Sequence, residues 1–172
     1  NPKDSLWQIE QYHFNNVATK RFYIQGDVEN PLLDVTFDGA RILDGDIVAP
    51  SPEISISLKD ENKYLFLNED KDTANFKIYL LDPEGNSQRI GFVSNASYSV
   101  DYQKSSRPTE PFSIQIKPNA LADGIYTLRV QAQDKSGNLS DDVEYSISFE
   151  IINKSTITNV MNYPNPFSTA TR

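Results

Sequence analysis

The chain has 172 residues, with 16 Lys and Arg against 24 Asp and Glu and a formal net charge of −8. This excess of negative charge repels phosphate backbones and anionic lipid surfaces, so nucleic acid is not an expected partner. The absence of Cys and the single His exclude disulfides, thiol nucleophiles and metal sites built from several Cys or His side chains. No apolar run reaches the roughly 18 residues of a membrane-spanning helix, so membrane insertion is not expected.

The predicted elements are nearly all strands. Residues 20–24 have the composition of a strand, and residues 40–43, between two Asp-Gly pairs, favour a hairpin or an edge kink. Residues 62–72 hold one apolar cluster, which favours a helical turn in a connection. Alternating apolar and polar side chains predict further strands at residues 54–58, 76–80, 89–94, 97–102, 112–116, 126–132 and 143–152.

Short strands separated by turns rich in Gly, Pro, Asn and Asp predict an all-β chain. We expect an immunoglobulin-like or fibronectin-like antiparallel β-sandwich over residues 30–152, with an N-terminal strand-rich extension. Residues 1–29 are then an extension or the edge of an upstream domain, and residues 153–172 are a linker into a following domain. The expected core consists of Ile54, Ile56, Leu58, Phe76, Ile78, Leu80, Phe112, Ile114, Ile116, Leu128, Val130, Tyr145, Ile147 and Phe149.

One local pattern concerns the start of the strand predicted at residues 126–132. Asp123, Gly124 and Tyr126 follow Leu121 at a spacing that resembles the tyrosine corner of immunoglobulin-like and fibronectin-type sandwiches. In that motif the Tyr hydroxyl bonds back to the backbone a few residues upstream. The resemblance implies that Tyr126 stabilises the fold, with Asp123 and Gly124 shaping the corner.

The C-terminal end carries the most specific string, which reads Tyr163, Pro164, Asn165, Pro166 and Phe167. It resembles the opening of the C-terminal sorting domains of proteins exported by the type IX secretion system of Bacteroidetes. The resemblance implies a parent protein that is secreted or held on the outer surface of a Gram-negative Bacteroidetes cell, with the secretion machinery as a partner. Because the chain begins at Asn1 rather than Met and stops just after this string, we expect an excised segment with a truncated sorting domain.

Three further segments, residues 30–39, 42–47 and 152–158, are similar to segments of large secreted Bacteroidetes proteins. In those proteins the segment follows a gingipain-like cysteine peptidase domain and precedes the sorting domain. The resemblance implies a parent that is a cysteine peptidase or a sortase-like relative. It does not make this segment an enzyme, because the catalytic Cys and His would lie upstream of Asn1.

The residues themselves also argue against catalysis in this segment. His13 is the only imidazole, no Gly-x-Ser-x-Gly elbow accompanies it, and no Gly-rich phosphate loop is present. A pair of catalytic carboxylates remains open on composition alone. The sequence therefore predicts no catalytic residues.

Two groups of polar residues in predicted turns suggest calcium. The first comprises Asp38, Asp44 and Asp46, and the second comprises Asp134, Asn138, Asp141 and Asp142, in a turn that resembles the F–G hairpin of bacterial immunoglobulin-like domains. Ca²⁺ binds carboxylate, amide and carbonyl oxygens. Neither group has EF-hand spacing, and Asp and Asn are ordinary turn formers. The sequence therefore predicts no cofactor and keeps calcium at the second group as the alternative.

These observations predict a non-catalytic accessory module that spaces or supports neighbouring domains of the same chain. It would link an upstream gingipain-like peptidase domain to a type IX sorting domain. The alternative is a carbohydrate-binding or adhesion module, in which exposed aromatic rings stack on sugars. The candidate rings are Trp7, Tyr12, Tyr23, Tyr98 and Tyr102.

Overall fold

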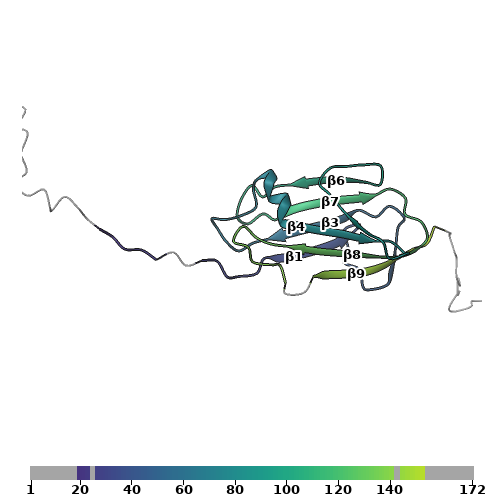
Figure 1. Ribbon diagram of the computed structural model, residues 1–172, viewed down its shortest axis with the longest axis horizontal. Coiled ribbons are helices and arrows are strands. Elements are labelled where there is room, and N and C mark those ends of the chain that lie inside the picture. Colours follow the sequence, from purple (N-terminus) through teal and green to yellow (C-terminus); the bar gives the residue numbers. More distant parts are fainter. Residues whose placement is uncertain (1–18, 24–25, 142–143, 154–172) are drawn as a thin grey trace, which may run out of the picture.

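Two β-sheets packed face to face form the molecule in the computed structural model, which describes residues 19–23, 26–141 and 144–153 (Figure 1). One sheet has the strand order β1-β3-β7-β6 and the other has the order β2-β9-β8-β4-β5. The strands are β1 (Leu32–Phe37), β2 (Asp46–Val48), β3 (Ile54–Lys59), β4 (Phe76–Leu81), β5 (Ser87–Arg89), β6 (Tyr98–Gln103), β7 (Phe112–Pro118), β8 (Gly124–Ala132) and β9 (Tyr145–Ile151).

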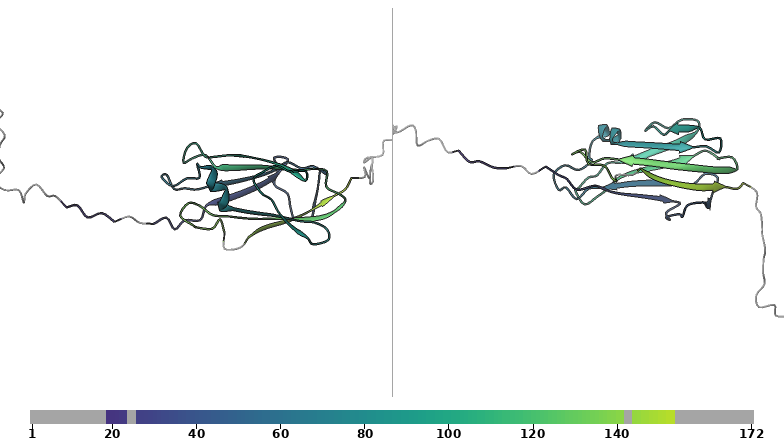
Figure 2. Two further views of the ribbon diagram at one scale, coloured as in Figure 1. Left: turned by 45° about the horizontal axis from the view of Figure 1, so that its top comes forward. Right: turned by 60° about the horizontal axis from the view of Figure 1, so that its bottom comes forward.

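This strand order is that of an immunoglobulin-type sandwich, so the predicted fold class is confirmed. Neighbouring strands pair antiparallel, except that the short β2 runs parallel to the last part of β9. Figure 2 shows the two layers from further sides. The chain reaches β2 by crossing from the first sheet to the second after a tight turn at Asp38 and Gly39, whose φ angles of 49° and 80° are both positive. The expected kink at residues 40–43 lies in this crossing.

The core lies between the sheets and is made by alternate residues of facing strands. All the predicted core residues are buried except Tyr145 and Ile147, which are half-buried. The reason is that β2 pairs only with residues 149–151 of β9, so the first part of β9 is a free edge of its sheet. The core also contains residues that the prediction lacked, namely Val35, Phe37, Leu67, Ile90, Tyr98, Tyr126, Ala132 and Ile151.

Several local predictions are wrong. Residues 20–23 form no strand, because no sheet of the described residues lies beside them. Of the strand predicted at residues 89–94, only Arg89 lies in a strand, the three-residue β5, whose side chains are all exposed at the sheet edge. The strands β1 and β2 were not predicted. The helical turn expected in residues 62–72 is present as the 3₁₀ helix η2 (Asp70–Asn75), displaced toward the C-terminal end of that range. Among the described residues no helix is long and apolar enough to cross a bilayer.

The sandwich has two distinct ends. Residues 26–31, here called the lead-in, enter β1 at the end where β3 and β8 finish. The chain leaves β9 at the opposite end, beside the start of β8, where Ile151 pairs with Gly124. Figure 1 shows the lead-in and the last described residues at opposite sides of the molecule. We call these the entry end and the exit end.

Gly124 gives a test of the exit end. Its φ is +146°, and a Cβ atom there would overlap the ring of Pro83. Gly124→Ala should therefore destabilise the fold by at least about 2 kcal/mol, from backbone strain and overpacking together. Gly137→Ala is the matched control, because Gly137 also has a positive φ (+92°) but open space around it. Urea unfolding measures both, and equal losses would contradict the Pro83 contact.

Candidate functional site

Two acidic side chains continue the inward-facing alternation of the central strands beyond the entry end. Asp60 follows Ile56 and Leu58 of β3 at the same two-residue spacing. Asp134 follows Val130 and Ala132 of β8 in the same way. Successive residues of a strand point to opposite faces, so both carboxylates lie on the core side of their sheets. They are buried, with 8% and 2% of their surfaces exposed.

The lead-in adds a third carboxylate to this pair. One carboxylate oxygen from each of Asp27, Asp60 and Asp134 lies within 4.8 Å of the other two. The three residues are far apart in sequence and meet only because β1, β3 and β8 bring their ends together. We call Asp27, Asp60 and Asp134 the acidic triad; its oxygens suit a hard cation.

Two asparagines hold the triad in place. The Asn62 amide donates to Asp27 Oδ2 over 2.8 Å. The Asn138 amide donates to Asp134 Oδ2 over 2.8 Å and to the backbone carbonyl of Asp27 over 3.2 Å. Backbone amides of Asn62 and Asn138 donate to Asp60 Oδ1 and Asp134 Oδ1. The lead-in is thus tied to the connections that follow β3 and β8.

One oxygen of the triad has no partner. Asp60 Oδ2 is buried and accepts no hydrogen bond, and it is alone in this among the side chains of the described residues. Asp72, another buried acid at this end, differs: its Oδ2 accepts from the amides of Asn68 and Glu69 and lies 3.2 Å from Lys135 Nζ. No described Lys or Arg forms an ion pair with the triad. A buried carboxylate oxygen without a partner is costly, so Asp60 Oδ2 is an exception among the described side chains.

The environment shifts the acidities within the triad in opposite directions. Burial raises the pKa of Asp60, and the neighbouring charges of Asp134 and Asp27 raise it further against a hydrogen bond from Asn62. The hydrogen bond from Asn62 lowers the pKa of Asp27, which lies nearer to solvent. The surroundings of Asp60 therefore favour its neutral form, whereas those of Asp27 favour its charged form.

The predicted calcium residues divide between this site and elsewhere. Asp134 belongs to the triad and Asn138 supports it. Asp141 is exposed and is not a member of the triad, and Asp142 lies outside the described residues. Asp27 and Asp60 were missed. The signal for Asp60 was present, because position 60 is the next inward-facing position after Leu58.

The other acidic group, Asp38, Asp44 and Asp46, lies toward the exit end and supports turns. The three side chains accept hydrogen bonds from the backbone amides of Glu53, Ser148 and Leu43 respectively. Their carboxylates form no three-membered cluster among the described residues. The structure therefore gives each of them a local role in shaping the backbone.

Tyr126 lies at the start of β8, where the tyrosine corner was predicted. It is 6% exposed and stacks on Phe149 with ring centres 5.8 Å apart. Burial raises the pKa of its hydroxyl, while the backbone of Ala122 lowers it. Asp123 accepts hydrogen bonds from Asn153, just after β9. The contribution of Tyr126 to stability stays a prediction.

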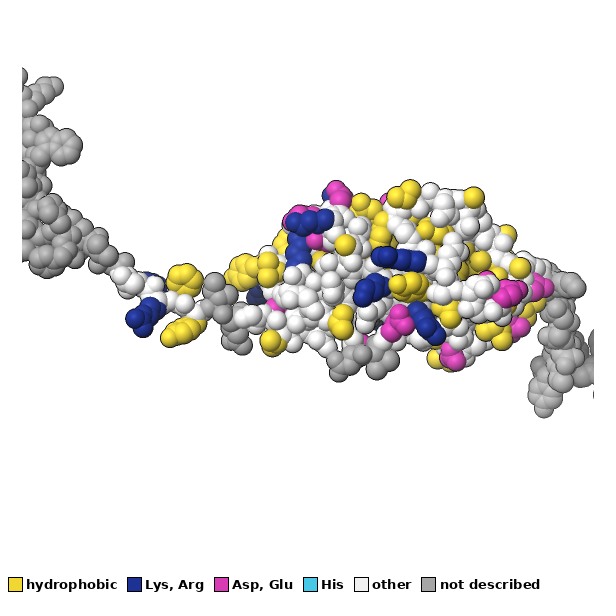
Figure 3. Space-filling model, viewed as in Figure 1, with side chains coloured by type: hydrophobic (Ala, Val, Ile, Leu, Met, Phe, Trp, Pro, Cys, Tyr) yellow, Lys and Arg dark blue, Asp and Glu magenta, His cyan; other side chains and the backbone are white. Residues whose placement is uncertain are grey.

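The candidate sugar-stacking rings in the described part of the chain do not gather on one face. Tyr98 is buried and its hydroxyl accepts from the Gly91 amide, while Tyr102 stacks on Phe112. Tyr23 is exposed but belongs to residues 19–23, upstream of the sandwich. On the face in Figure 3, hydrophobic side chains lie in several separate places among polar ones. Trp7, Tyr12, His13 and the string of Tyr163 to Phe167 lie outside the described residues.

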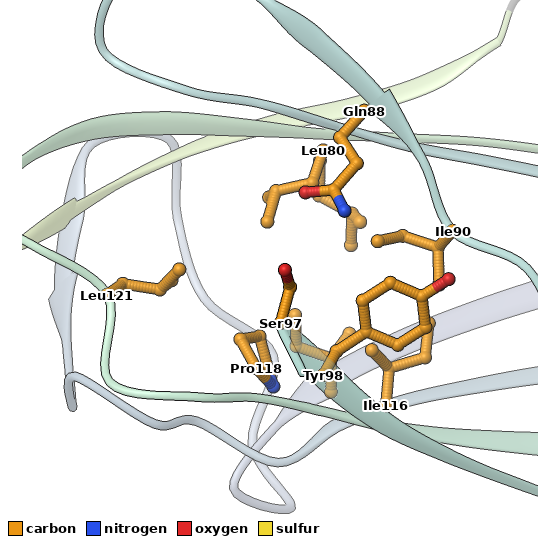
Figure 4. Close-up of a pocket in the computed structure, with 10 residues that line it drawn as sticks. Leu80, Gln88, Ile90, Ser97, Tyr98, Ile116, Pro118 and Leu121 are labelled. Carbon is orange, nitrogen blue, oxygen red and sulfur yellow. The ribbon is translucent and has the colours of Figure 1, made fainter. Parts of the chain in front are cut away.

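A small cavity opens between the sheets toward the exit end (Figure 4). It has a volume of about 60 Å³, and its lining is mostly apolar, including Leu80, Ile90, Ile116 and Leu121. No Asp, Glu, His, Lys or Arg contributes to it. The space suits one or two water molecules or a small apolar group, and it contains no acid–base pair.

No family model and no curated protein matches this chain. Among solved structures, it resembles CopC from Methylosinus trichosporium OB3b, with 17% identity, 71% of this chain and 93% of that chain covered, and a TM-score of 0.41. It also resembles the archaellum periplasmic stator protein complex FlaF and FlaG from Sulfolobus acidocaldarius, with 17% identity, coverages of 75% and 100%, and a TM-score of 0.40. Domains 4 and 5 of the S-layer protein SbsC give 15% identity, coverages of 72% and 54%, and a TM-score of 0.30. Similarity at this level carries no inference about function.

Asp60→Asn tests the cost of the buried charge. The folded-state pKa of Asp60 is raised, so the folded protein favours the neutral carboxyl group. The stability gained from this group is therefore present below its unfolded pKa and is lost as the pH rises through its folded pKa. In buffer with EDTA at pH 7, the variant should melt about 2–4 °C higher than the wild type, the shift that 1 kcal/mol produces in a domain of this size. The difference should vanish at a pH below the unfolded pKa. The control is Asp101→Asn, which makes the same charge change at an exposed position and should leave the melting temperature nearly unchanged. A lower melting temperature for Asp60→Asn than for the wild type at pH 7 would contradict a cost of the buried charge.

Tyr126→Phe tests the corner. If the hydroxyl bonds to the backbone near Ala122, as the corner requires, its loss should cost about 1–2 kcal/mol. The melting temperature should fall by roughly 3–6 °C, measured by calorimetry. Tyr64→Phe is the control, because Tyr64 is 88% exposed. An unchanged melting temperature for Tyr126→Phe would rule out the corner.

Proposed function

We propose that this chain is a non-catalytic spacer module of a secreted or cell-surface protein, which separates and orients the domains on either side of it. The observation that carries the proposal is that the chain enters the sandwich at one end and leaves it at the other (Figure 1). A rigid sandwich with its ends apart holds its neighbours at a fixed separation. Domains whose ends lie together cannot do this.

The proposal also names the domains on either side of the sandwich. The string from Tyr163 to Phe167 supports a type IX sorting domain downstream, and the likeness of residues 30–39 supports a gingipain-like peptidase domain upstream. In this proposal the parent is exported to the outer surface of a Bacteroidetes cell. The sandwich then links the catalytic domain to the sorting domain.

A carbohydrate-binding module is the second candidate, and the structure gives it less support. Such a module needs two or three exposed rings on one face. Of the candidate rings in the described part of the chain, Tyr98 is buried, Tyr102 is packed against Phe112, and only Tyr23 is freely exposed.

A domain replacement in the parent gene tests the spacer function. Residues 30–152 are either deleted or replaced by an unrelated sandwich whose ends also lie at opposite sides. Deletion should lower the amount or activity of the secreted parent, because the neighbouring domains then crowd each other. The unrelated sandwich should restore both, because a spacer acts through its dimensions.

The opposite pattern would reject a passive spacer. If only the native sandwich restores the parent, the module recognises something specific. Retention of the isolated module on insoluble polysaccharides would then identify carbohydrate binding, whereas the spacer model predicts no retention.

A further inference from the structure

We infer that the acidic triad is a calcium site, which fixes the lead-in to the sandwich at the entry end. Its ligands are the carboxylates of Asp27, Asp60 and Asp134, each of which has one oxygen within 4.8 Å of an oxygen of the other two. The site differs from the turn group at Asp134 to Asp142, because two of its three carboxylates come from the lead-in and from the end of β3.

The first argument is the unpartnered oxygen. Asp60 is 8% exposed, and its Oδ2 accepts no hydrogen bond. Both carboxylate oxygens of the buried Asp134 accept a hydrogen bond, and Oδ2 of the buried Asp72 accepts two, so the fold is able to satisfy buried carboxylates at this end. A buried carboxylate that keeps one oxygen free and clusters with two further carboxylates has the surroundings of a metal ligand, since a cation would supply the missing partner.

The second argument is charge. Three carboxylates within 4.8 Å repel one another, and no described Lys or Arg pairs with them. The amides of Asn62 and Asn138 satisfy Asp27 and Asp134 without neutralising them. A divalent cation would reduce the local charge from −3 to −1.

The donor set selects the metal. All three ligand atoms of the cluster are carboxylate oxygens. No His or Cys belongs to the cluster, which disfavours zinc and copper. Ca²⁺ accepts several carboxylates from flexible segments, whereas Mg²⁺ demands strict octahedral geometry and keeps its water. The triad draws its ligands from a lead-in and two loops, which favours Ca²⁺.

The consequence concerns the direction in which the chain approaches the sandwich. Pro31 is buried, but residues 28–30 are exposed. Between them and residue 26, Asp27 accepts hydrogen bonds from the side chains of Asn62 and Asn138 of the sandwich. A cation shared by Asp27 and the two buried acids would join the lead-in to both sheets. This consequence rests on the proposed spacer function; the calcium site itself does not.

Calcium binding is tested on the 172-residue chain after treatment with EDTA. Thermal unfolding and isothermal titration are measured with CaCl₂ and, separately, with MgCl₂. At about 5 mM, CaCl₂ should raise the melting temperature by several degrees, with a Kd of about 0.1–1 mM as in extracellular modules. MgCl₂ should bind at least about tenfold more weakly.

Three variants assign the site. Asp60→Asn and Asp27→Asn should each weaken calcium binding at least about tenfold, because each removes an anionic ligand. Asp101→Asn, which removes the same charge from an exposed position, should bind calcium as the wild type does. Asp27 lies outside both sheets, so its variant decides the question even if Asp60→Asn fails to fold. No calcium-dependent shift in the wild type, equal binding by the variants, or equal affinity for magnesium would overturn the assignment.

Amide hydrogen exchange tests whether calcium fixes the lead-in to the sandwich. Calcium should slow amide hydrogen exchange at residues 27–29 in the wild type and leave it unchanged in Asp27→Asn. Unchanged exchange in a wild type that binds calcium would overturn the role in fixing the lead-in. The domain replacement in the parent tests the spacer function separately, so the two proposals can fail independently.

Discussion

The structure depends on the packing of aromatic and aliphatic side chains between its two sheets. Phe76 of β4 and Phe112 of β7 belong to different sheets and stack with ring centres 5.1 Å apart near the entry end. Phe37 of β1 and Phe149 of β9 make the corresponding contact, also at 5.1 Å, toward the exit end. Without Cys, no disulfide joins the sheets. Burial of these side chains therefore supplies the stabilising free energy that holds the layers together.

The acidic triad follows directly from the same arrangement. Leu58 pairs with Phe112 and Ala132 pairs with Phe76, so the next inward positions, Asp60 and Asp134, lie just beyond the aromatic stack. Apolar residues there would simply extend the core. Burial of the Asp60 carboxylate with one oxygen unpartnered costs free energy instead, so stability alone does not explain an acid at this position.

The position of the triad in the chain fits a role other than stability. The entry end is where the lead-in joins the sandwich, and the third carboxylate, Asp27, belongs to the lead-in itself. A module that orients its neighbours needs a defined junction as well as a rigid body. Face-to-face packing provides the rigid body, while the triad is placed where a cation would define the junction.

The sequence by itself determined the fold class, most strands and most of the core, because a two-residue alternation fixes which side chains face inward. It did not determine the short edge strands, such as β5, since edge positions are exposed on both sides and lose the alternation. The same alternation could have predicted a buried Asp60, because it is the next inward-facing position after Leu58. Only the tertiary structure brought Asp27 to Asp60 and Asp134, because their proximity arises from the order of strands in two sheets and from no local pattern.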